Sequence, residues 1–175
     1  TDYGEELVNS FAESASQLGI QIVHSSSFFA GTTNFRDNVI ATFKMKEFDA
    51  IFLAAGSKDG GELIKQSRDM DVTQPFIGGD ALYSEKLANI AGKKETAEGT
   101  VVPTVYKPTF NVAQPFIQKY KEKYKEEPEI WSAQGYDSIK LLAHAIERAD
   151  SIVPSILATT LRYMPPWVGV TGIHA

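Results

Sequence analysis

The sequence predicts an α/β fold in which a parallel sheet is flanked by helices. Two apolar runs carry this prediction: residues 50–55 stop at Gly56 and Ser57, and residues 75–77 stop at two glycines and Asp80. An amphipathic helical pattern lies between the two runs. Strands that are buried on both faces of a parallel sheet have such continuous apolar runs. Because ligands of these sheets bind beyond the carboxyl ends of the strands, we expect a binding site at these two strand ends.

The first segment, residues 1–18, predicts a helix. Asp2 and Glu5 have the spacing of a capping box, and Gly19 supplies a helix stop. The residues expected on its inward face are Leu7, Phe11, Ala15 and Leu18. A helix is an unusual first element for an α/β protein, so we expect the chain to be an excised or cleaved piece of a longer one.

Further elements are predicted up to residue 106. Residues 20–24 predict a short strand, and residues 99–106 predict a β-branched strand that Pro103 restricts to an edge or a crossover. Asn34 is placed to cap the next helix. That helix is expected to turn inward Phe35, Val39, Ile40 and Phe43. Two minor segments complete this half: a short helix at residues 85–91 and a charged loop at residues 93–98.

The pattern changes between residues 107 and 162, where no buried strand is predicted. Amphipathic helices are expected at residues 111–125, 132–150 and 154–162, and a strand and turn at 167–172. Their inward faces carry Phe116, Ile117, Tyr120, Tyr124, Tyr136, Ile139, Leu142, Ala143 and Ile146. An amphipathic stripe implies a surface that covers it, yet no sheet is predicted for these helices.

Composition excludes several classes of function. The 175 residues allow one full domain, or one and part of another, and 43% hydrophobic residues suffice for a core. The formal net charge of −5 argues against a nucleic-acid partner. There is no cysteine, which excludes disulfides and thiolate chemistry. No apolar run approaches the ~20 residues of a membrane-spanning helix, and no signal peptide pattern is present.

No motif indicates catalysis, a cofactor or a metal. The glycine-rich residues 56–61 resemble a phosphate loop at first sight, but they lack the G-x-G-x-x-G spacing. His24, His144 and His174 are scattered without metal-ligand spacing. The lysines of residues 119–125 are most simply explained as a solvated helix face, and no two carboxylates are paired for acid–base work.

Two residues have both a structural and a functional interpretation. Asp80 follows two glycines at a strand end, where it can cap the next turn or accept charge-assisted hydrogen bonds from a ligand ammonium. Tyr3 lies at a helix start, where it can be a packing residue or a ring on the wall of the site.

A family resemblance rests on the order of several short motifs. They are Tyr3-Gly4-Glu5, Gly31 with Phe35 and Val39, Phe48-Asp49-Ala50, Gly78-Gly79-Asp80, Ala97-Glu98-Gly99 and Gly135-Tyr136-Asp137-Ser138. The segment Gly169-Val170-Thr171-Gly172 resembles a late motif of the same family. The chain resembles the type I periplasmic binding proteins of the leucine/isoleucine/valine-binding family, which serve ABC transporters, over nearly its whole length.

The resemblance implies an incomplete two-lobe fold of the periplasmic-binding-protein-like I type. Family members have two Rossmann-like lobes joined by crossover segments, and the ligand is trapped between them. Residues 1–103 would form the second lobe, and residues 104–165 would be helices of the first lobe. Residues 166–175 would start a return crossover. The sheet of the first lobe would lie before Thr1.

The resemblance also assigns ligand-binding residues. Asp80 matches the acidic residue for the ligand amine, Tyr3 an aromatic residue of the site wall, and Tyr136 a first-lobe position near the ligand. Gly56, beside Ser57 at its strand end, falls where several members carry a large aromatic, which leaves room for a bulkier or different ligand. Asn34 replaces a frequent Asp, a change that would affect only a helix cap.

The expected function is capture of an amino acid or a related small molecule by hinge closure, for delivery to an ABC permease. A periplasmic or other extracytoplasmic location, with or without a lipid anchor, follows from the resemblance. The alternatives are the sensory domain of a receptor with the same fold, and an α/β enzyme. We also expect the uncovered helices to find a partner by repacking on their own lobe, by dimerising, or by retaining a separate N-terminal piece.

Overall fold

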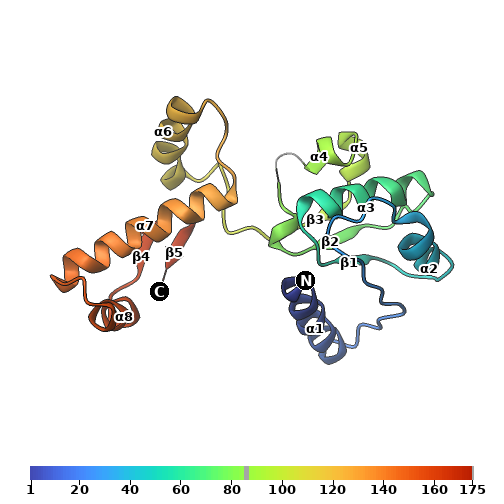
Figure 1. Cartoon of the computed structure of the whole chain (residues 1–175), viewed down its shortest axis with the longest axis horizontal. Helices are drawn as coiled ribbons and strands as arrows, with labels where there is room; N and C mark the ends of the chain where they lie inside the picture. The colour runs from blue at the N-terminus through green and yellow to red at the C-terminus, as the bar shows by residue number, and fades with distance from the viewer. Residues whose placement is uncertain (85–86, 175) are drawn as a thin grey trace. The chain divides into compact units, whose positions relative to one another are not determined.

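The computed structural model describes residues 1–84 and 87–174, and the chain forms two compact units, Thr1–Pro103 and Thr104–Ala175 (Figure 1). Each unit is described separately. Within the described ranges, no helix combines the length and the apolar character needed to cross a membrane.

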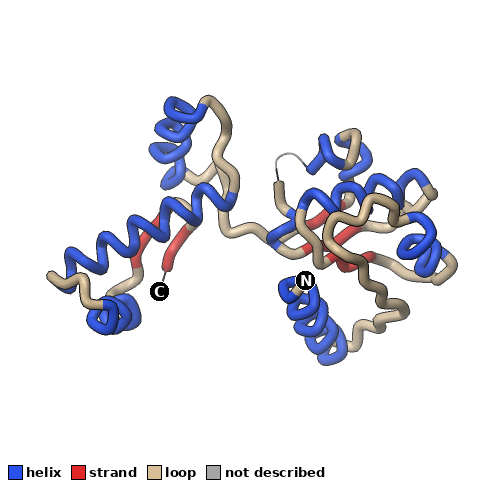
Figure 2. The backbone as a smooth tube through the Cα atoms, viewed as in Figure 1, coloured by secondary structure: helices blue, strands red, loops and turns tan. Residues whose placement is uncertain are grey.

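The first unit is built on a parallel sheet, as predicted. Its strands are β1 (Ile51–Leu53), β2 (Phe76–Gly78) and β3 (Thr100–Val101), in the order β1-β2-β3. Both pairs are parallel, with Phe52 opposite Ile77 and Ile77 opposite Val101. The strands lie side by side among the helices of this unit (Figure 2). The edge position of β3 agrees with the prediction from Pro103, but the strand is shorter than the predicted residues 99–106 and ends at Val101, two residues before Pro103.

Helix α3 (Ser57–Asp69) is the predicted amphipathic helix between β1 and β2, and it buries Leu63 and Ile64. Its last turn is fastened by Arg68, whose guanidinium donates to the carbonyl oxygens of Val72 (2.5 Å), Gln74 (2.9 Å) and Glu98 (3.3 Å). Burial lowers the pKa of Arg68 below its ordinary value. Arg68 therefore joins the end of α3 to the chain before β2 and before β3.

The helix that follows residue 35 also packs into the apolar core of the first unit. This helix is a π-helical turn, η1 (Arg36–Ile40), that continues as α2 (Ala41–Lys44). The N-cap residue is Phe35 and not the predicted Asn34, although Asn34 Oδ1 accepts a hydrogen bond from Arg36 N at 3.0 Å. The predicted inward residues Phe35, Val39, Ile40 and Phe43 are all buried.

The N-terminal helix α1 (Asp2–Gln17) forms where it was predicted, but its cap differs. Thr1, and not Asp2, is the N-cap, and its hydroxyl accepts a hydrogen bond from Gly4 N at 3.3 Å. Thr1 precedes the first helical residue, which is the position from which a side-chain oxygen reaches the free N–H groups. The helix ends at Gln17 with Leu18 as its C-cap, and the predicted stop residue Gly19 follows with a φ of 71°.

The inward face of α1 was only partly predicted. Ala15 is buried, and Phe11 stacks on Phe52 of β1 with 3.9 Å between the ring centroids. Leu18, by contrast, is exposed. The contact between Phe11 and Phe52 places the helix against β1.

The predicted strand at residues 20–24 is wrong. This segment forms no ladder with another described segment, and 53% of Ile20 is exposed. A strand needs a hydrogen-bonded neighbour, and the sheet in this unit ends at β1. Local sequence did not reveal the absence of a partner strand.

Two short helices lie between β2 and β3. The predicted helix at residues 85–91 is found as α4 (Leu87–Ile90), and Glu85 and Lys86 lie outside the described residues. The charged loop predicted at residues 93–98 instead contains a single helical turn, α5 (Lys94–Ala97). Lys, Glu and Ala are strong helix formers, and this propensity outweighs the charge pattern on which the loop was predicted.

The second unit is helical, with one hairpin. Its helices are η3 (Asn111–Ala113), α6 (Gln114–Tyr124), α7 (Ile130–Ala149) and α8 (Pro154–Tyr163). The strands β4 (Trp167–Gly169) and β5 (Gly172–His174) pair antiparallel, as the predicted strand and turn required. The predicted helices are confirmed, with shifts of at most a few residues.

The predicted inward face of α7 is wrong in this unit. Tyr136, Ile139 and Leu142 are exposed, Ile139 to 68%. The helix instead buries Ile130, Ala133, Asp137 and Ala145. The apolar stripe on α7 is therefore not covered by any other element described in this unit.

Candidate functional site

The candidate site lies at the carboxyl ends of β1 and β2. After β2, Gly79 continues in an extended conformation, and the chain then turns into a 3-10 helix, η2 (Asp80–Leu82). The N–H group of Tyr83 closes this turn by donating to the carbonyl oxygen of Asp80 at 3.0 Å. Asp80 is thus the first residue of this turn, two residues after the end of β2, and its side chain is half-buried.

Asp80 and Tyr3 are in direct contact, although 77 positions separate them in the sequence. The phenol of Tyr3 donates to Asp80 Oδ1 at 3.1 Å. The backbone N–H of Ala81 also donates to Asp80 Oδ1, at 2.9 Å, and reaches the Tyr3 oxygen at 3.4 Å. Both hydrogen bonds to Asp80 use Oδ1, so among the described residues Oδ2 has no hydrogen-bond partner. Oδ1 accepts the N–H of the next residue inside the turn, but η2 has no side-chain cap, because its N-cap residue is Gly79. Oδ2 remains without a partner among the described residues.

Tyr3 is held as a neutral hydrogen-bond donor. Partial burial raises the pKa of the phenol above its ordinary value. The Ala81 N–H opposes this shift, whereas the hydrogen bond to Asp80 and the charge of Asp80 add to it. A neutral phenol donates its proton to the carboxylate, which fixes the direction of the hydrogen bond.

The start of α1 approaches the strand ends closely because glycines line its path. A Cβ atom added to Gly4 would lie 3.3 Å from the carbonyl oxygen of Ala54, just after β1. A Cβ added to Gly79 would lie 2.5 Å from Leu7 Cδ2. The first turns of α1 therefore lie over the carboxyl ends of both strands.

Gly56 and Ser57 occupy the neighbouring strand end. Gly56 is the N-cap residue of α3 and is exposed, and a Cβ added to it would meet no atom within 4 Å. Ser57 begins the helix and is half-buried. The first turn of α3 carries Asp59, whose Oδ2 accepts a hydrogen bond from Gly31 N at 3.0 Å. A carboxylate in this turn repels phosphate, which argues against a phosphate loop at this helix start.

Tyr136 lies in α7 of the second unit, half exposed, with its ring 4.8 Å from that of Phe116. The structure thus brings Tyr3 and Asp80 together and places Gly56 and Ser57 at the adjacent strand end. The predicted role of Tyr136 remains a prediction.

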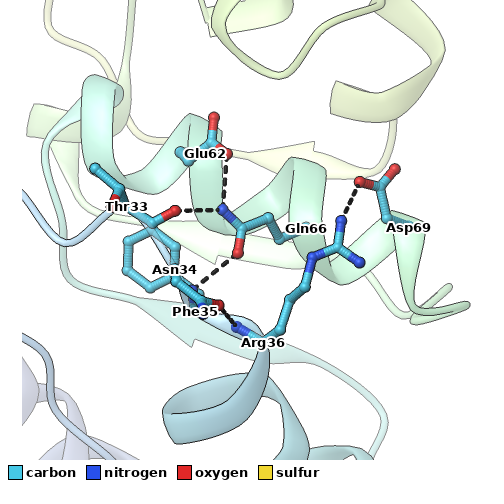
Figure 3. Close-up of polar contacts among 7 residues, drawn as sticks. All are labelled: Thr33, Asn34, Phe35, Arg36, Glu62, Gln66 and Asp69. Carbon is cyan, nitrogen blue, oxygen red and sulfur yellow. Dashed lines mark hydrogen bonds and ion pairs between the residues drawn. The ribbon is translucent and has the colours of Figure 1, made fainter.

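A polar cluster beside α3 was not predicted (Figure 3). The buried amide of Gln66 donates to Thr33 O at 2.9 Å and to Glu62 Oε1 at 2.7 Å, and it accepts from Phe35 N at 2.8 Å. A shallow pocket of about 280 Å³ opens beside this cluster. Gln66 fastens the loop before η1 to α3, and a lone glutamine in a helix carries no sequence signal for such a contact.

A buried carboxylate in the second unit was also missed. Asp137 accepts hydrogen bonds from Val170 N (2.9 Å), Thr171 N (2.8 Å) and Thr171 Oγ1 (2.6 Å). His174 Nε2 lies 3.5 Å from its Oδ2. Asp137 and residues 169–172 belong to two motifs that carried the family resemblance, but the sequence did not show that they contact each other. No group of metal-ligating side chains occurs within residues 1–84 and 87–174.

The parallel α/β unit, with its polar pair beyond the strand ends, has the architecture of a ligand-binding domain. A family model described as periplasmic binding protein matches residues 1–175, and the chain therefore belongs to this family of binding proteins. The expected resemblance is confirmed.

Several members of the family are similar to this chain. The Leu/Ile/Val-binding protein homolog 1 of Brucella suis biovar 1 is 26% identical over 98% of this chain and 46% of its own length. The branched-chain amino acid transporter substrate binding protein LivJ of Streptococcus pneumoniae, solved with isoleucine, is 29% identical, with a TM-score of 0.86 over 100% of this chain and 49% of its own. The leucine binding protein LivK of Thermotoga maritima is 31% identical, with a TM-score of 0.87 over 99% and 49%. This chain therefore spans about half the length of the relatives that it matches.

Proposed function

We propose that the whole protein captures an amino acid, by pairing the ligand ammonium with Asp80 and Tyr3, for delivery to an ABC permease. One observation supports this proposal above the others: Asp80 uses only Oδ1 within the described chain, at the end of a strand. Relatives over nearly the whole chain include an isoleucine complex and a leucine-binding protein.

The chemistry of the pair suits an ammonium ion. A carboxylate makes short, charge-assisted hydrogen bonds with an N–H donor of positive charge. Oδ1 is fixed by two donors, the Ala81 N–H and the Tyr3 phenol, and this fixes the direction of Oδ2. A carboxylate held in this way does not have to reorganise when the ligand arrives, which preserves binding energy.

The mechanism in this proposal is capture by closure. Residues 1–103 would form one lobe of the whole protein, and the rest of the ligand shell, including Tyr136, would come from the other. Closure around the ligand would create the form that a permease recognises. The protein would act outside the cytoplasm, free in the periplasm or held by a lipid anchor. It would release its ligand chemically unchanged.

We further propose that this 175-residue chain by itself associates through the exposed apolar faces of its helices. Exposed large side chains on α7 and α8 include Tyr136, Ile139, Leu142, Ile156 and Leu161. Large contiguous apolar patches on a soluble protein usually mark interaction surfaces.

Isothermal titration calorimetry of the whole protein, freed of bound ligand, tests the main proposal. Leucine, isoleucine and valine are the probes, and 4-methylpentanoate, which is leucine without its amine, is the matched control. We expect saturable binding of at least one amino acid, weak binding of the control, and recovery of the ligand unchanged. Equal affinity for leucine and 4-methylpentanoate would contradict recognition of the ammonium, and turnover would contradict a pure binding function.

A further inference from the structure

Gly79 is a glycine whose backbone does not require glycine. Its φ of −78° and ψ of 177° are extended values that any residue adopts. The space for a side chain, however, is already occupied. A Cβ atom added at this position would lie closer than 3.0 Å to the Tyr3 phenol oxygen and 2.5 Å from Leu7 Cδ2. Two side chains of α1 therefore fill the space that a side chain at position 79 would occupy.

We propose that Gly79 is a positioning residue of the binding site: its lack of a side chain lets α1 place the Tyr3 phenol against Asp80. This inference rests on the proposed function, because its importance for binding follows from the role of Asp80. Gly79 itself contacts no ligand in this account. It acts through Tyr3, which in turn fixes Asp80 Oδ1.

The phenol has no other way to accommodate a methyl group at Gly79. A tyrosine ring is rigid and its oxygen lies on the χ2 axis, so the oxygen moves only by rotation about χ1 or with the backbone. Withdrawal of the whole helix does not keep the contact either, because it carries the Tyr3 oxygen away from Asp80. The helix is also close to the end of β1, where a Cβ added to Gly4 would lie only 3.3 Å from Ala54 O, so α1 cannot shift toward that strand to make room. Substitution of Gly79 by alanine should therefore separate Tyr3 from Asp80.

Gly56 is a matched control within the same unit. It follows the adjacent strand β1, and its φ of −71° and ψ of 162° are close to those of Gly79. A Cβ added to Gly56 would meet no atom within 4 Å. The two glycines thus differ in what surrounds them and not in backbone conformation, so Gly56→Ala is the control for the state of the Tyr3 phenol.

The test follows the Tyr3 phenol by NMR in the 175-residue chain, with carbon-13 at Cζ of its seven tyrosines. Tyr3→Phe identifies the Tyr3 signal. Burial and Asp80 hold the pKa of Tyr3 above its ordinary value. We expect Gly79→Ala to lower this pKa toward the ordinary value and Gly56→Ala to leave it unchanged. The same Tyr3 titration in Gly79→Ala and in the wild-type chain would overturn the proposal.

A second variant covers the case in which Gly79→Ala does not fold. Leu7→Ala removes the other side chain that occupies the space beside Gly79. The double variant Leu7→Ala/Gly79→Ala is then compared with Leu7→Ala alone. We expect the same fall in the Tyr3 pKa, and an unchanged pKa would overturn the proposal. The signals of the other six tyrosines (seven less Tyr3 itself) report whether the effect is local.

Leucine titration of the whole protein connects the phenol to binding. The Gly79→Ala variant should bind leucine about tenfold or more weakly than wild type, because it loses one hydrogen bond to a charged group. Unchanged affinity, with Tyr3 displaced, would overturn the role of this contact in the site. If wild-type whole protein binds no amino acid, the proposed function fails, whereas the phenol measurement still decides the positioning role.

Discussion

A single carboxylate, Asp80, connects three features of the site. It accepts hydrogen bonds from the Ala81 N–H in the turn after β2 and from the Tyr3 phenol, and it keeps Oδ2 free of partners within the described chain. Tyr3 belongs to α1, so the candidate site depends on how this helix packs on the strand ends. The state of the Tyr3 phenol therefore reports on the integrity of the site.

Stability at alkaline pH should depend on Tyr3. Its pKa is higher in the folded chain than in the unfolded chain, so the folded state binds the phenol proton more tightly. This contribution is fully present below the unfolded value of about 10 and is lost as the pH rises through the raised folded value. We expect the unfolding free energy of the wild type to fall relative to that of Tyr3→Phe as the pH rises above about 10. Urea unfolding at a series of alkaline pH values measures it, and a pH-independent difference would contradict it.

Gln66 should contribute more to stability than the exposed ion pair beside it. Gln66→Leu leaves the Phe35 N–H without its acceptor in a buried place, which costs about 1–3 kcal/mol of unfolding free energy. The Arg36–Asp69 pair at 2.8 Å is about half exposed. Asp69→Ala should therefore cost at most about 1 kcal/mol. Urea unfolding measures both, and equal costs would show that the amide cluster does not fasten the loop.

At the scale of elements, the sequence predicted what local pattern and strand-end chemistry determine. The apolar runs before Gly56 and Gly79 gave β1, β2 and the position of the site, because strands buried on both faces have a distinctive composition. Residues 20–24 failed as a strand because pairing depends on a neighbour, which local sequence does not reveal. The contact between Tyr3 and Asp80 joins distant parts of the chain, so only the family resemblance related the two.

The hairpin β4–β5 should detach from α7 when Asp137 is removed. Asp137 is buried and accepts hydrogen bonds from Val170 N, Thr171 N and the Thr171 hydroxyl. Asp137→Ala leaves two backbone donors without partners, at a cost of about 3 kcal/mol. Hydrogen exchange of the Val170 and Thr171 amides should become much faster.

Ser138→Ala is the control for this effect, because the exposed Ser138 hydroxyl donates a hydrogen bond to Gln134 O in its own helix and none to the described residues of the hairpin. Its exchange rates should match those of the wild type. Protected Val170 and Thr171 amides in Asp137→Ala would show that β4–β5 is held by other contacts.

At the scale of the whole molecule, the main feature of the second unit is an exposed apolar face on helix α7. Ile139 and Leu142 lie on the exposed side of α7, while its buried side packs within the unit. The chain spans about half the length of its relatives. The other half of such a protein is the natural cover for this face in the proposed two-lobe arrangement.

Without that cover, the 175-residue chain should associate. We expect light scattering to show an apparent mass above the monomer value of 19.2 kDa that rises with concentration. Ile139→Glu with Leu142→Glu should lower it, because charged residues at the centre of an apolar contact are strongly disfavoured. A monomer at all concentrations would contradict association through α7.

The central claim is that Asp80 holds the ammonium group of an amino acid, and calorimetry of the whole protein with the variant Asp80→Asn tests it most directly. Leucine and 4-methylpentanoate are titrated into wild type and variant. We predict that Asp80→Asn weakens leucine binding by about 2–5 kcal/mol, as for a truncated buried charge pair. Binding of 4-methylpentanoate should not weaken, because it has no ammonium. Unchanged leucine affinity, or an equal loss for both ligands, would contradict the account.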